Sequence, residues 1–370
     1  MKMKAAVMTA PGAPLEIRQV ELDPPKAGEV LVRIRATAVC HSDLNTLNDP
    51  TTPVPQVLGH EGAGEVVAVG DNVKTCQVGD HVALSWDPAC GVCPYCRTGR
   101  THLCEAAFGP MFAGTLLDGT SRLHLDGGPA YHMSLLSTFA EYTVVPEMSC
   151  VKIPHEMPMA PASMIGCGVA TGFGAAVRAG GVTAGSSVAV FGLGAVGTNA
   201  IQGARLAGAS VIVACDRKEQ NLARARAYGA THTINVGQTE DVPQAIRDLT
   251  EGIGADCAID CTGSPRAGAT AYASIRKGGT AVVVGAYPGD GKLILPAGGF
   301  HRTGKILRGS FYGDVNPFHD FPLIARMYLD GKYDLDSLII ERIGLEDINR
   351  AFASFHDPDG DNMGRYIIEF

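Results

Sequence analysis

Four cysteines lie close together at a spacing that suits metal binding. They are Cys90, Cys93, Cys96 and Cys104, on a loop that also carries glycines and a proline. Thiolates at such short spacing can close a tetrahedral shell around zinc without ligands from elsewhere in the chain. Since four protein ligands leave no open coordination position, we expect a structural zinc site. Ligand type alone also allows an iron–sulfur cluster.

A second set of metal-ligand residues is scattered along the chain. Cys40, His60 and Cys167 each stand beside small or turn-forming residues. One histidine and two cysteines, with a fourth position for water or substrate, form a known catalytic zinc shell. Spacing alone leaves this grouping open, because single cysteines and histidines more often belong to a core or a surface.

A glycine-rich turn offers a site for a dinucleotide. Residues 188–191 are apolar, as in a buried parallel strand, and residues 195–207 have helical composition. The turn between them has the pattern G-x-G-x-x-G and includes Gly192, Leu193, Gly194, Val196 and Gly197. Its glycines permit a tight turn, the approach of a pyrophosphate and close packing of helix on strand, and the helix N-terminus attracts phosphate. The alternative is a glycine-rich turn that binds nothing.

An acidic residue follows the next apolar strand. Asp216 ends the run at residues 210–215 and lies 24 residues after Gly192. That distance is close to the roughly 20 residues expected for a carboxylate that binds the adenosine ribose. Its charge would repel a 2′-phosphate, which favours NAD over NADP. Arg217, directly after it, is a cation and leaves NADP as an alternative.

Composition limits the partners and indicates a compartment. With 370 residues, 46% of them hydrophobic and 18% charged, the chain has apolar material for two domains. A net charge of −8 argues against nucleic acid or an anionic membrane surface as partner. We find no apolar run of membrane-spanning length, and the N-terminus reads as a first strand rather than a signal peptide. The 11 cysteines then favour metal binding in a reducing cytoplasm over a disulfide framework.

The elements that must position these residues follow two patterns. The first 165 or so residues show short alternating segments with frequent turn signals, which predicts an irregular β-rich domain. Strands and helices then alternate, which predicts a doubly wound parallel sheet of Rossmann type. Its further helices are expected at 219–228 and 242–250, and its further strands at 257–261 and 280–285. After a helix at 318–329, the final strand at 365–370 is expected to return to the first domain.

Taken together, these pieces resemble the zinc-dependent alcohol dehydrogenases of the medium-chain dehydrogenase/reductase family. The matching motifs are Ala38-Val-Cys-His-Ser-Asp43, Gly59-His-Glu-Gly-Ala-Gly64, the four-cysteine lobe, Gly166-Cys-Gly168, the glycine turn and Arg365-Tyr-Ile-Ile-Glu-Phe370. The resemblance implies a GroES-like irregular β catalytic domain at residues 1–168 and 311–370, with the structural-zinc lobe at 90–104. It places an NAD-binding Rossmann domain at 169–310. It also implies a homodimer, or a tetramer built from dimers, joined by sheet edges.

The same resemblance implies roles for individual residues. Glu61 can approach the metal during ligand exchange, and Asp43 orients the ligand imidazole. Zinc lowers the pKa of a bound alcohol, and the alkoxide transfers hydride to NAD. Ser42 hydrogen bonds the substrate oxygen and begins the proton path. The implied ligands of the catalytic zinc are Cys40, His60 and Cys167.

Several cofactor contacts follow in the same way, with two departures. His41 and Arg365 match residues that contact the pyrophosphate, and Thr171 matches one that packs on the nicotinamide; the plain alternative for the first two is a surface position. Asn45 stands where many members carry the histidine that ends the proton relay, and an amide cannot accept a proton near neutral pH. Asn221 stands where some members have a lysine near the ribose.

The substrate remains open between rival hypotheses. Trp86 matches a wall of the substrate pocket and Phe108 lies in a glycine-rich stretch suited to its rim, although both residue types are equally common in cores. The leading hypothesis is an NAD-dependent zinc alcohol dehydrogenase that interconverts alcohols, especially primary medium-chain or aromatic ones, with aldehydes or ketones. A thiol-dependent formaldehyde dehydrogenase is the nearest rival, and it would need basic residues for the carboxylates of the thiol; the sequence alone does not place Arg97, Arg100 or Arg122. The presence of the catalytic-type ligands argues against a zinc-free enone or quinone reductase and against a non-catalytic, nucleotide-sensing zinc protein.

Overall fold

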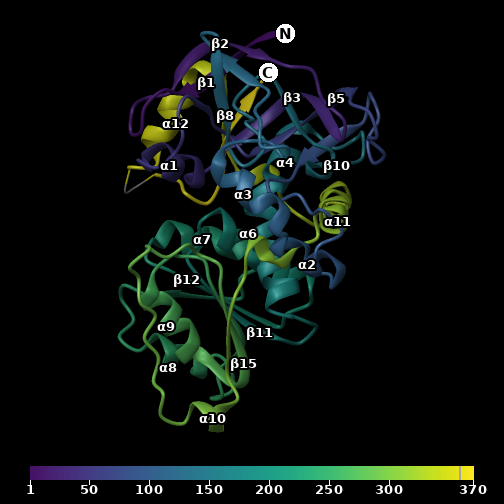
Figure 1. Ribbon diagram of the computed structural model, residues 1–370. Coiled ribbons are helices and arrows are strands. Elements are labelled where there is room, and N and C mark those ends of the chain that lie inside the picture. Colours follow the sequence, from purple (N-terminus) through teal and green to yellow (C-terminus); the bar gives the residue numbers. More distant parts are fainter. Residues whose placement is uncertain (358–359) are drawn as a thin grey trace. The chain divides into compact units, whose positions relative to one another are not determined.

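The computed structural model describes residues 1–357 and 360–370, which form two compact units (Figure 1). The first unit comprises Met1–Cys167 and Asn316–Phe370, and the second comprises Gly168–Val315. The chain enters the second unit beside residue 168 and leaves it at residue 315 rather than at 310.

The first unit is built from a closed barrel and a mixed sheet. The barrel strands, in order around it, are β1 (Lys2–Met8), β2 (Glu16–Leu22), β7 (Leu123–Leu125), β8 (Gly128–His132) and β4 (Gln56–Val57). The sheet strands, in spatial order, are β10 (Cys150–Lys152), β6 (His81–Leu84), β5 (Glu61–Val69), β3 (Glu29–Val39), β18 (Arg365–Glu369) and β17 (Ile339–Ile343). A further strand, β9 (Tyr142–Pro146), pairs with β3.

Strand β3 is the element on which the first unit is assembled. It alternates buried Val30, Val32 and Ile34 with less buried arginines, as expected for a strand with one face on a core. It pairs antiparallel with β5, β9 and β18, so that the C-terminal strand joins the N-terminal part of the chain. The helices of this unit are α1 (His41–Asn48), α2 (Pro94–Arg97), α3 (Glu105–Ala113), α4 (Met159–Met164), α11 (Pro317–Leu329) and α12 (Ile348–Ser354).

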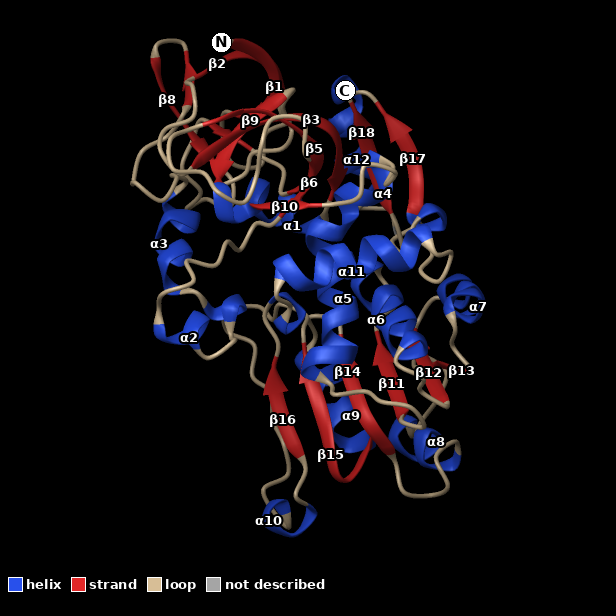
Figure 2. Ribbon diagram, turned by 90° about the vertical axis from the view of Figure 1, so that its right-hand side faces the viewer, coloured by secondary structure: helices blue, strands red, loops and turns tan. Residues whose placement is uncertain are grey.

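The second unit contains the expected doubly wound sheet (Figure 2). Its described strands, all paired in parallel, follow the spatial order β13 (His232–Asn235), β12 (Val211–Asp216), β11 (Ser187–Phe191), β14 (Ala255–Asp260), β15 (Ile275–Val283) and β16 (Ile306–Gly309). Its helices include α5 (Ala170–Gly174), α6 (Ala195–Leu206), α7 (Glu219–Tyr228), α8 (Val242–Asp248), α9 (Pro265–Ser274) and α10 (Phe300–Thr303). The order reverses between β11 and β14, and ligands bind at such a reversal in parallel sheets.

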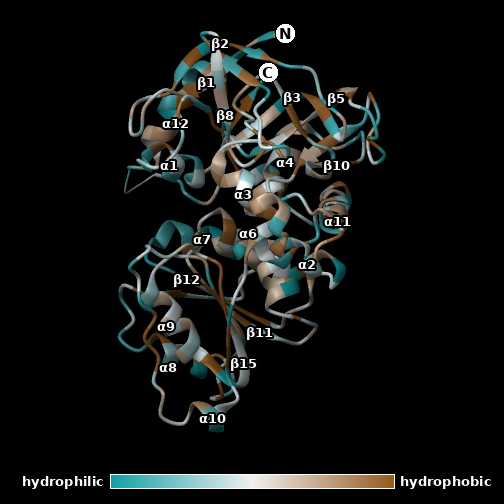
Figure 3. Ribbon diagram, viewed as in Figure 1, coloured by the Kyte–Doolittle hydropathy of each residue, from teal (hydrophilic) through white to brown (hydrophobic). Residues whose placement is uncertain are grey.

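Most predicted elements of this unit are confirmed. Helix α7 has the expected bounds and ends at Gly229, whose φ of +119° is a conformation that glycine adopts easily. Helix α8 ends earlier than expected, at Asp248, and β15 begins earlier, at Ile275. The central strands are strongly hydrophobic because both faces are covered (Figure 3).

One apolar helix is longer than the sequence analysis allowed. Met159–Ala179 is long and apolar enough to cross a membrane by length and composition alone, so the expectation that no run reaches this length was wrong. The stretch is rich in alanine and glycine, and 83% of its most apolar window is buried inside the protein. It therefore has the burial of a core helix. It contains π-helical turns at Ile165–Val169 and Ala175–Ala179.

Candidate active site and metal centres

The structure brings together the scattered metal-ligand residues. One potential ligand atom from each of Cys40, His60, Glu61 and Cys167 lies within 4.8 Å of the others. All four belong to the first unit: Cys40 follows β3, His60 and Glu61 stand at the start of β5, and Cys167 lies on the first π-helical turn. Such turns are frequent at functional sites. Two thiols, an imidazole and a carboxylate are a donor set that fits zinc.

Asp43 holds two of these residues in place. Its Oδ2 accepts a hydrogen bond from the backbone N–H of Cys40 at 2.8 Å, and its Oδ1 lies 2.8 Å from Nδ1 of His60. This bond leaves Nε2 of His60 as the nitrogen available to a metal. Although burial opposes the change, the Asp43 carboxylate raises the pKa of His60 well above its ordinary value. Asp43 is completely buried, so the carboxylate and the imidazole depend on each other for their charge.

Glycines allow the backbone to pack closely beside two of the ligands. A Cβ atom at Gly166 would lie 2.4 Å from the carbonyl oxygen of Leu84, so only glycine fits before Cys167. Gly59 has a φ of +94°, and a Cβ atom there would lie 2.6 Å from the backbone nitrogen of Phe139. These close approaches explain the glycines that precede Cys167 and His60 in the sequence.

Arg365 lies at the same cluster. Its Nη2 is 3.1 Å from Oε1 of Glu61 and 3.2 Å from Sγ of Cys40, and its side chain is buried. The alternative of a surface arginine is therefore wrong. Burial raises the pKa of Glu61 to about 7, although the Arg365 guanidinium opposes this rise. A hydrogen bond from Cys167 and the charge of Arg365 hold the pKa of Cys40 well below its usual value, despite burial.

The four clustered cysteines form a second metal centre. The sulfur atoms of Cys90, Cys93, Cys96 and Cys104 all lie within 4.8 Å of one another. Four thiols gathered this closely are the donor set of one tetrahedral zinc ion. Backbone N–H groups point at the sulfurs: that of Cys93 is 3.3 Å from Sγ of Cys90, and that of Cys96 lowers the pKa of Cys93 to about 6. The pKa of Cys93 thus favours a thiolate, whereas burial raises the pKa of Cys96 to about 12 and also raises that of Cys104.

The glycine turn in the second unit has the geometry of a phosphate site. Gly192 has a φ of +82°, and a Cβ atom at Gly197 would lie 1.8 Å from the carbonyl oxygen of Gly192. Gly194 caps α6, the helix whose first turn contains Val196. Asp216 ends β12, where its Oδ2 accepts a hydrogen bond from the backbone of Leu193 at 2.7 Å. This bond fixes the Asp216 carboxylate, which is expected to bind the ribose, to the glycine turn.

The remaining predicted residues are distributed over both units. Ser42 and His41 are exposed on the first turn of α1, and the His41 ring lies 5.4 Å from that of Phe355. Thr171 is half-buried on α5 of the second unit, and Arg217 is exposed after β12. The departures from the family pattern are placed differently, because Asn45 is exposed and Asn221 is buried.

The two aromatic residues expected at the substrate pocket differ in their surroundings. Trp86 is half-buried against an apolar cluster that includes Val82 and Leu84. Phe108 lies on α3 with 55% of its surface exposed, and its ring centroid is 4.9 Å from that of Phe112. The stretch around Phe108 is thus partly helical, and it presents two aromatic rings to its surroundings.

Sequence reasoning missed two groups of buried polar residues. Asp260 is the last residue of β14, at the reversal of strand order; it is completely buried and accepts a hydrogen bond from the hydroxyl of Tyr287 at 2.7 Å. Its place at the end of an apolar strand was the available signal. Asp87 lies next to Trp86, and burial raises its pKa to about 8. No spacing rule indicated that this carboxyl is buried.

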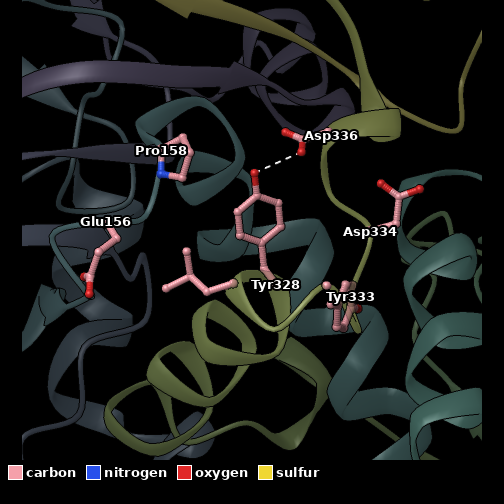
Figure 4. Close-up of a pocket in the computed structure, with 8 residues that line it drawn as sticks. Glu156, Pro158, Tyr328, Tyr333, Asp334 and Asp336 are labelled. Atoms are coloured by element: carbon pink, nitrogen blue, oxygen red, sulfur yellow. Dashed lines mark hydrogen bonds between the residues drawn. The ribbon is translucent and has the colours of Figure 1, made fainter.

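A cavity elsewhere in the first unit contains none of the predicted site residues among those that line it. It has a volume of about 440 Å³ and lies between the segment before α4 and the end of α11. Figure 4 shows Tyr328 in its centre, with its hydroxyl donating a hydrogen bond to Asp336 at 2.9 Å.

Comparison with known proteins agrees with this geometry. Residues 26–155 match the family described as alcohol dehydrogenase GroES-like domain, and residues 195–329 match the one described as zinc-binding dehydrogenase. The S-(hydroxymethyl)glutathione dehydrogenase of Paracoccus denitrificans is 39% identical over 366 residues, covering 96% of this chain and 97% of that protein.

Two solved structures extend the similarity. An alcohol dehydrogenase zinc-binding domain protein from Burkholderia ambifaria superposes with a TM-score of 0.95 at 37% identity, covering 100% of this chain and 99% of that one. The benzyl alcohol dehydrogenase of Acinetobacter calcoaceticus gives 0.93 at 34% identity with the same coverage. The fold and the two clusters therefore define a zinc-dependent oxidoreductase that uses a nicotinamide dinucleotide. The chain belongs to the zinc-dependent alcohol dehydrogenases of the medium-chain dehydrogenase/reductase family.

Replacing Asp43 by asparagine tests how the catalytic-type cluster is held. The amide keeps the shape of the side chain but loses the charge that orients His60, and such partners typically contribute 10- to 100-fold to metal affinity. We expect Asp43→Asn to lower zinc affinity by roughly this factor at one of the two centres, as measured by competition with a chelator.

The matched control is Asp49→Asn, at the exposed end of the same helix. It should leave both zinc ions as firmly bound as in the unaltered protein. Equal zinc retention by the Asp43 and Asp49 variants would refute the role given to Asp43.

Proposed function

We propose that this chain oxidises apolar primary alcohols, medium-chain or aromatic, directly with NAD and without a thiol carrier. The observation that bears most directly on this choice is the position of Arg122, one of the three basic residues considered for a thiol. A carrier thiol needs cations for its carboxylates, but the Arg122 side chain is 1% exposed. Its Nε donates to Glu29 at 2.9 Å, and its Nη2 donates to Asp118 at 2.8 Å. Arg122 is therefore committed inside the fold.

Two further features support an apolar substrate. The aromatic pair Phe108 and Phe112 is exposed on α3, and large exposed apolar side chains often mark binding surfaces. Trp86 adds a third ring in the same unit. The similarity to a benzyl alcohol dehydrogenase at 34% identity agrees with an aromatic or apolar alcohol.

The chain's own residues would divide the work of alcohol oxidation as follows. A zinc ion at the Cys40, His60 and Cys167 cluster would supply Lewis-acid chemistry, which lowers the pKa of an alcohol. Asp43 fixes the orientation of His60, and Arg365 balances the charge of Glu61. Ser42 would accept the hydroxyl proton and pass it on. Because Asn45 cannot take up this proton, the path from the exposed Ser42 would lead to solvent.

The dinucleotide would be held by the second unit. The N–H groups at the start of α6 would bind its pyrophosphate, and Thr171, which lies in the same unit, would pack on the nicotinamide. Oxygens of Asp216 that already accept backbone hydrogen bonds retain lone pairs for the ribose hydroxyls. The buried Asp260 accepts a hydrogen bond from the backbone N–H of Thr262. Thr262 lies directly against the glycine turn, since a Cβ atom at Gly192 would be 2.7 Å from its side chain. Asp260 would therefore stiffen the chain that faces the turn.

A thiol-dependent formaldehyde dehydrogenase is the second candidate. It is favoured by the name of a relative that is 39% identical over nearly the whole chain. Arg97 and Arg100 are exposed on the four-cysteine lobe and would be the cations for such a thiol. The two candidates share the metal centres and the dinucleotide site, and they differ only in how the substrate is held.

The substrate class can be tested by NADH formation with a series of alcohols from ethanol to octanol and benzyl alcohol. We expect kcat/KM to rise with apolar size and to be at least 10-fold higher for benzyl alcohol than for ethanol, since each added methylene contributes up to about 1–3 kcal/mol in an apolar pocket. Cys40→Ala should abolish turnover, whereas Cys257→Ala, at a buried cysteine on β14, should not.

The same assay distinguishes the two candidates. Turnover of formaldehyde that requires glutathione, with silence across the alcohols, would replace the first candidate by the second. Undiminished turnover in Cys40→Ala would exclude both.

Cofactor preference provides a further prediction. We propose that NAD is used rather than NADP because the Asp216 carboxylate would repel a 2′-phosphate. Asp216→Ser should reduce kcat/KM for NAD by roughly 10-fold or more and raise that for NADP, measured with the best alcohol. Asp241→Ser, which removes an exposed acid that caps α8, should change neither value. Equal use of both cofactors by the unaltered enzyme would contradict the assignment.

We propose a homodimer joined through the edge of the parallel sheet, or a tetramer built from such dimers. Among the described residues, β16 pairs with β15 alone, so its other edge is open. Ile306 on this strand is 51% exposed, and Phe300 just before it is 48% exposed. Open apolar edges are otherwise a liability in a protein that stays monomeric.

Ile306→Lys should therefore halve the mass in solution, measured by light scattering. Ile253→Lys places the same charge at another exposed isoleucine of the second unit, 62% exposed, and should have no effect. If the unaltered protein proves to be a monomer in the same measurement, the proposal is contradicted. The structure describes all eleven cysteines as free thiols, which supports the cytoplasm as the compartment.

A further inference from the structure

Two cysteines outside both metal centres lie together in the first unit. Cys76 is on the irregular segment between β5 and β6, and Cys150 is the first residue of β10. They are separated by 74 residues in sequence, but the Cys76 thiol donates a hydrogen bond to the carbonyl oxygen of Cys150 at 3.7 Å. We propose that Cys76 and Cys150 form a reversible disulfide, a redox-modification site of this enzyme that is separate from its zinc centres.

The surroundings of the pair favour bond formation over metal binding. Both cysteines belong to one apolar cluster with Val66, Val82 and Leu84. Cys76 is 7% exposed and Cys150 is completely buried. Neither belongs to a group of three or more metal-ligand residues among the described part of the chain. A pair of thiols in an apolar cluster has each other as its natural reaction partner.

The two thiols differ in reactivity, as an attacking and a resolving cysteine must. A hydrogen bond from the Cys150 thiol lowers the pKa of Cys76, although burial opposes this. Burial, and then the hydrogen bond to Cys76, raise the pKa of Cys150 well above its usual value. Cys76 is also the more exposed of the two, so an oxidant meets the more acidic thiol first.

Three further cysteines, Cys215, Cys257 and Cys261, lie outside both metal centres and outside this pair. Burial raises the pKa of Cys257 to about 12 and shifts those of Cys215 and Cys261 in the same direction. Thiols held in their neutral form react slowly with oxidants. The contrast makes Cys76 the distinctive thiol outside the metal centres.

The chemistry balances with hydrogen peroxide as the oxidant. The Cys76 thiolate attacks one peroxide oxygen, the O–O bond breaks, and Cys76 becomes a sulfenic acid while the other oxygen leaves as water after protonation. The Cys150 sulfur then attacks the sulfur of Cys76, an S–S bond forms, and the S–O bond breaks to release a second water. Two thiols are oxidised and one peroxide is reduced. A small dithiol reverses the step by thiol–disulfide exchange.

The disulfide would brace the strands beneath Trp86. Cys150 is paired with Leu84 in the ladder between β10 and β6, and the backbone of Ser85 donates to Ser149 at 2.8 Å. Trp86 packs on the same apolar cluster as the two cysteines. A covalent link from the β5–β6 segment to β10 would therefore limit opening of this cluster, and closing a chain loop of this length stabilises the folded state.

The test uses the zinc-loaded full-length enzyme treated with hydrogen peroxide at a few equivalents, alkylated and mapped without reduction. Combined cleavage at lysine and arginine and before aspartate leaves Cys76 in residues 75–79 and Cys150 in residues 126–152, apart from every metal-ligand cysteine. We expect a linked peptide of these two segments, lost on treatment with dithiothreitol. The melting temperature of the oxidised protein should rise by roughly 5 °C.

Matched variants assign the effect. Cys76→Ser should abolish both the linked peptide and the rise in melting temperature, while Cys215→Ser should retain both. If Cys150→Ser folds poorly, the peptide map of the oxidised unaltered protein still shows whether Cys76 and Cys150 are linked. Oxidation of Cys76 with Cys150 left as a free thiol, or a rise in melting temperature that persists in Cys76→Ser, would overturn the proposal. Zinc measured in parallel distinguishes this reaction from oxidation of the metal ligands.

Discussion

The arrangement of the catalytic-type cluster depends on one buried carboxylate. Asp43 accepts from the backbone at the end of β3 and from the imidazole at the start of β5, so it fixes Cys40 and His60 against each other. A completely buried charge is costly unless it is fully paired, and each of these partners contributes to that pairing. The helix that begins after Cys40 supplies Asp43 one turn later, so ligand and carboxylate are set by the same local structure. The strands, in turn, are held by pairing across the sheet.

Sites whose residues lie close together in the sequence could be predicted from the sequence alone. The four clustered cysteines and the glycine turn work through spacings of a few residues, and the structure brings both together as expected. The parallel sheet was readable because its strands are apolar on both faces and its helices end at signals such as Gly229. The scattered ligands needed the family resemblance, since nothing in their spacing shows that Cys167 reaches Cys40.

Interactions between residues that are far apart in the sequence could not be predicted from it. Arg365 and Glu61 are 304 residues apart, and only the pairing of β18 with β3 brings them together. Arg122 could not be placed from the sequence, because its burial with Glu29 depends on the closure of the barrel. The apolar helix at Met159–Ala179 was misjudged because glycine and alanine weaken its signal in a sequence, although the helix they form is continuous. The burial of Asp87 and Asp260 likewise follows from packing.

The pairing of β18 with β3 has a consequence for biosynthesis. The second unit is one uninterrupted stretch, Gly168–Val315, and it can begin to fold on the ribosome as soon as it emerges. The first unit cannot be completed at that time, because one of its sheet strands, β18, and the cation beside Glu61 follow the second unit in the sequence. A truncated translation product would hold an assembled parallel sheet beside an open β-sheet edge and an acid without its counter-charge. The order of the elements therefore delays completion of the metal site until the residues that follow the second unit have been synthesised.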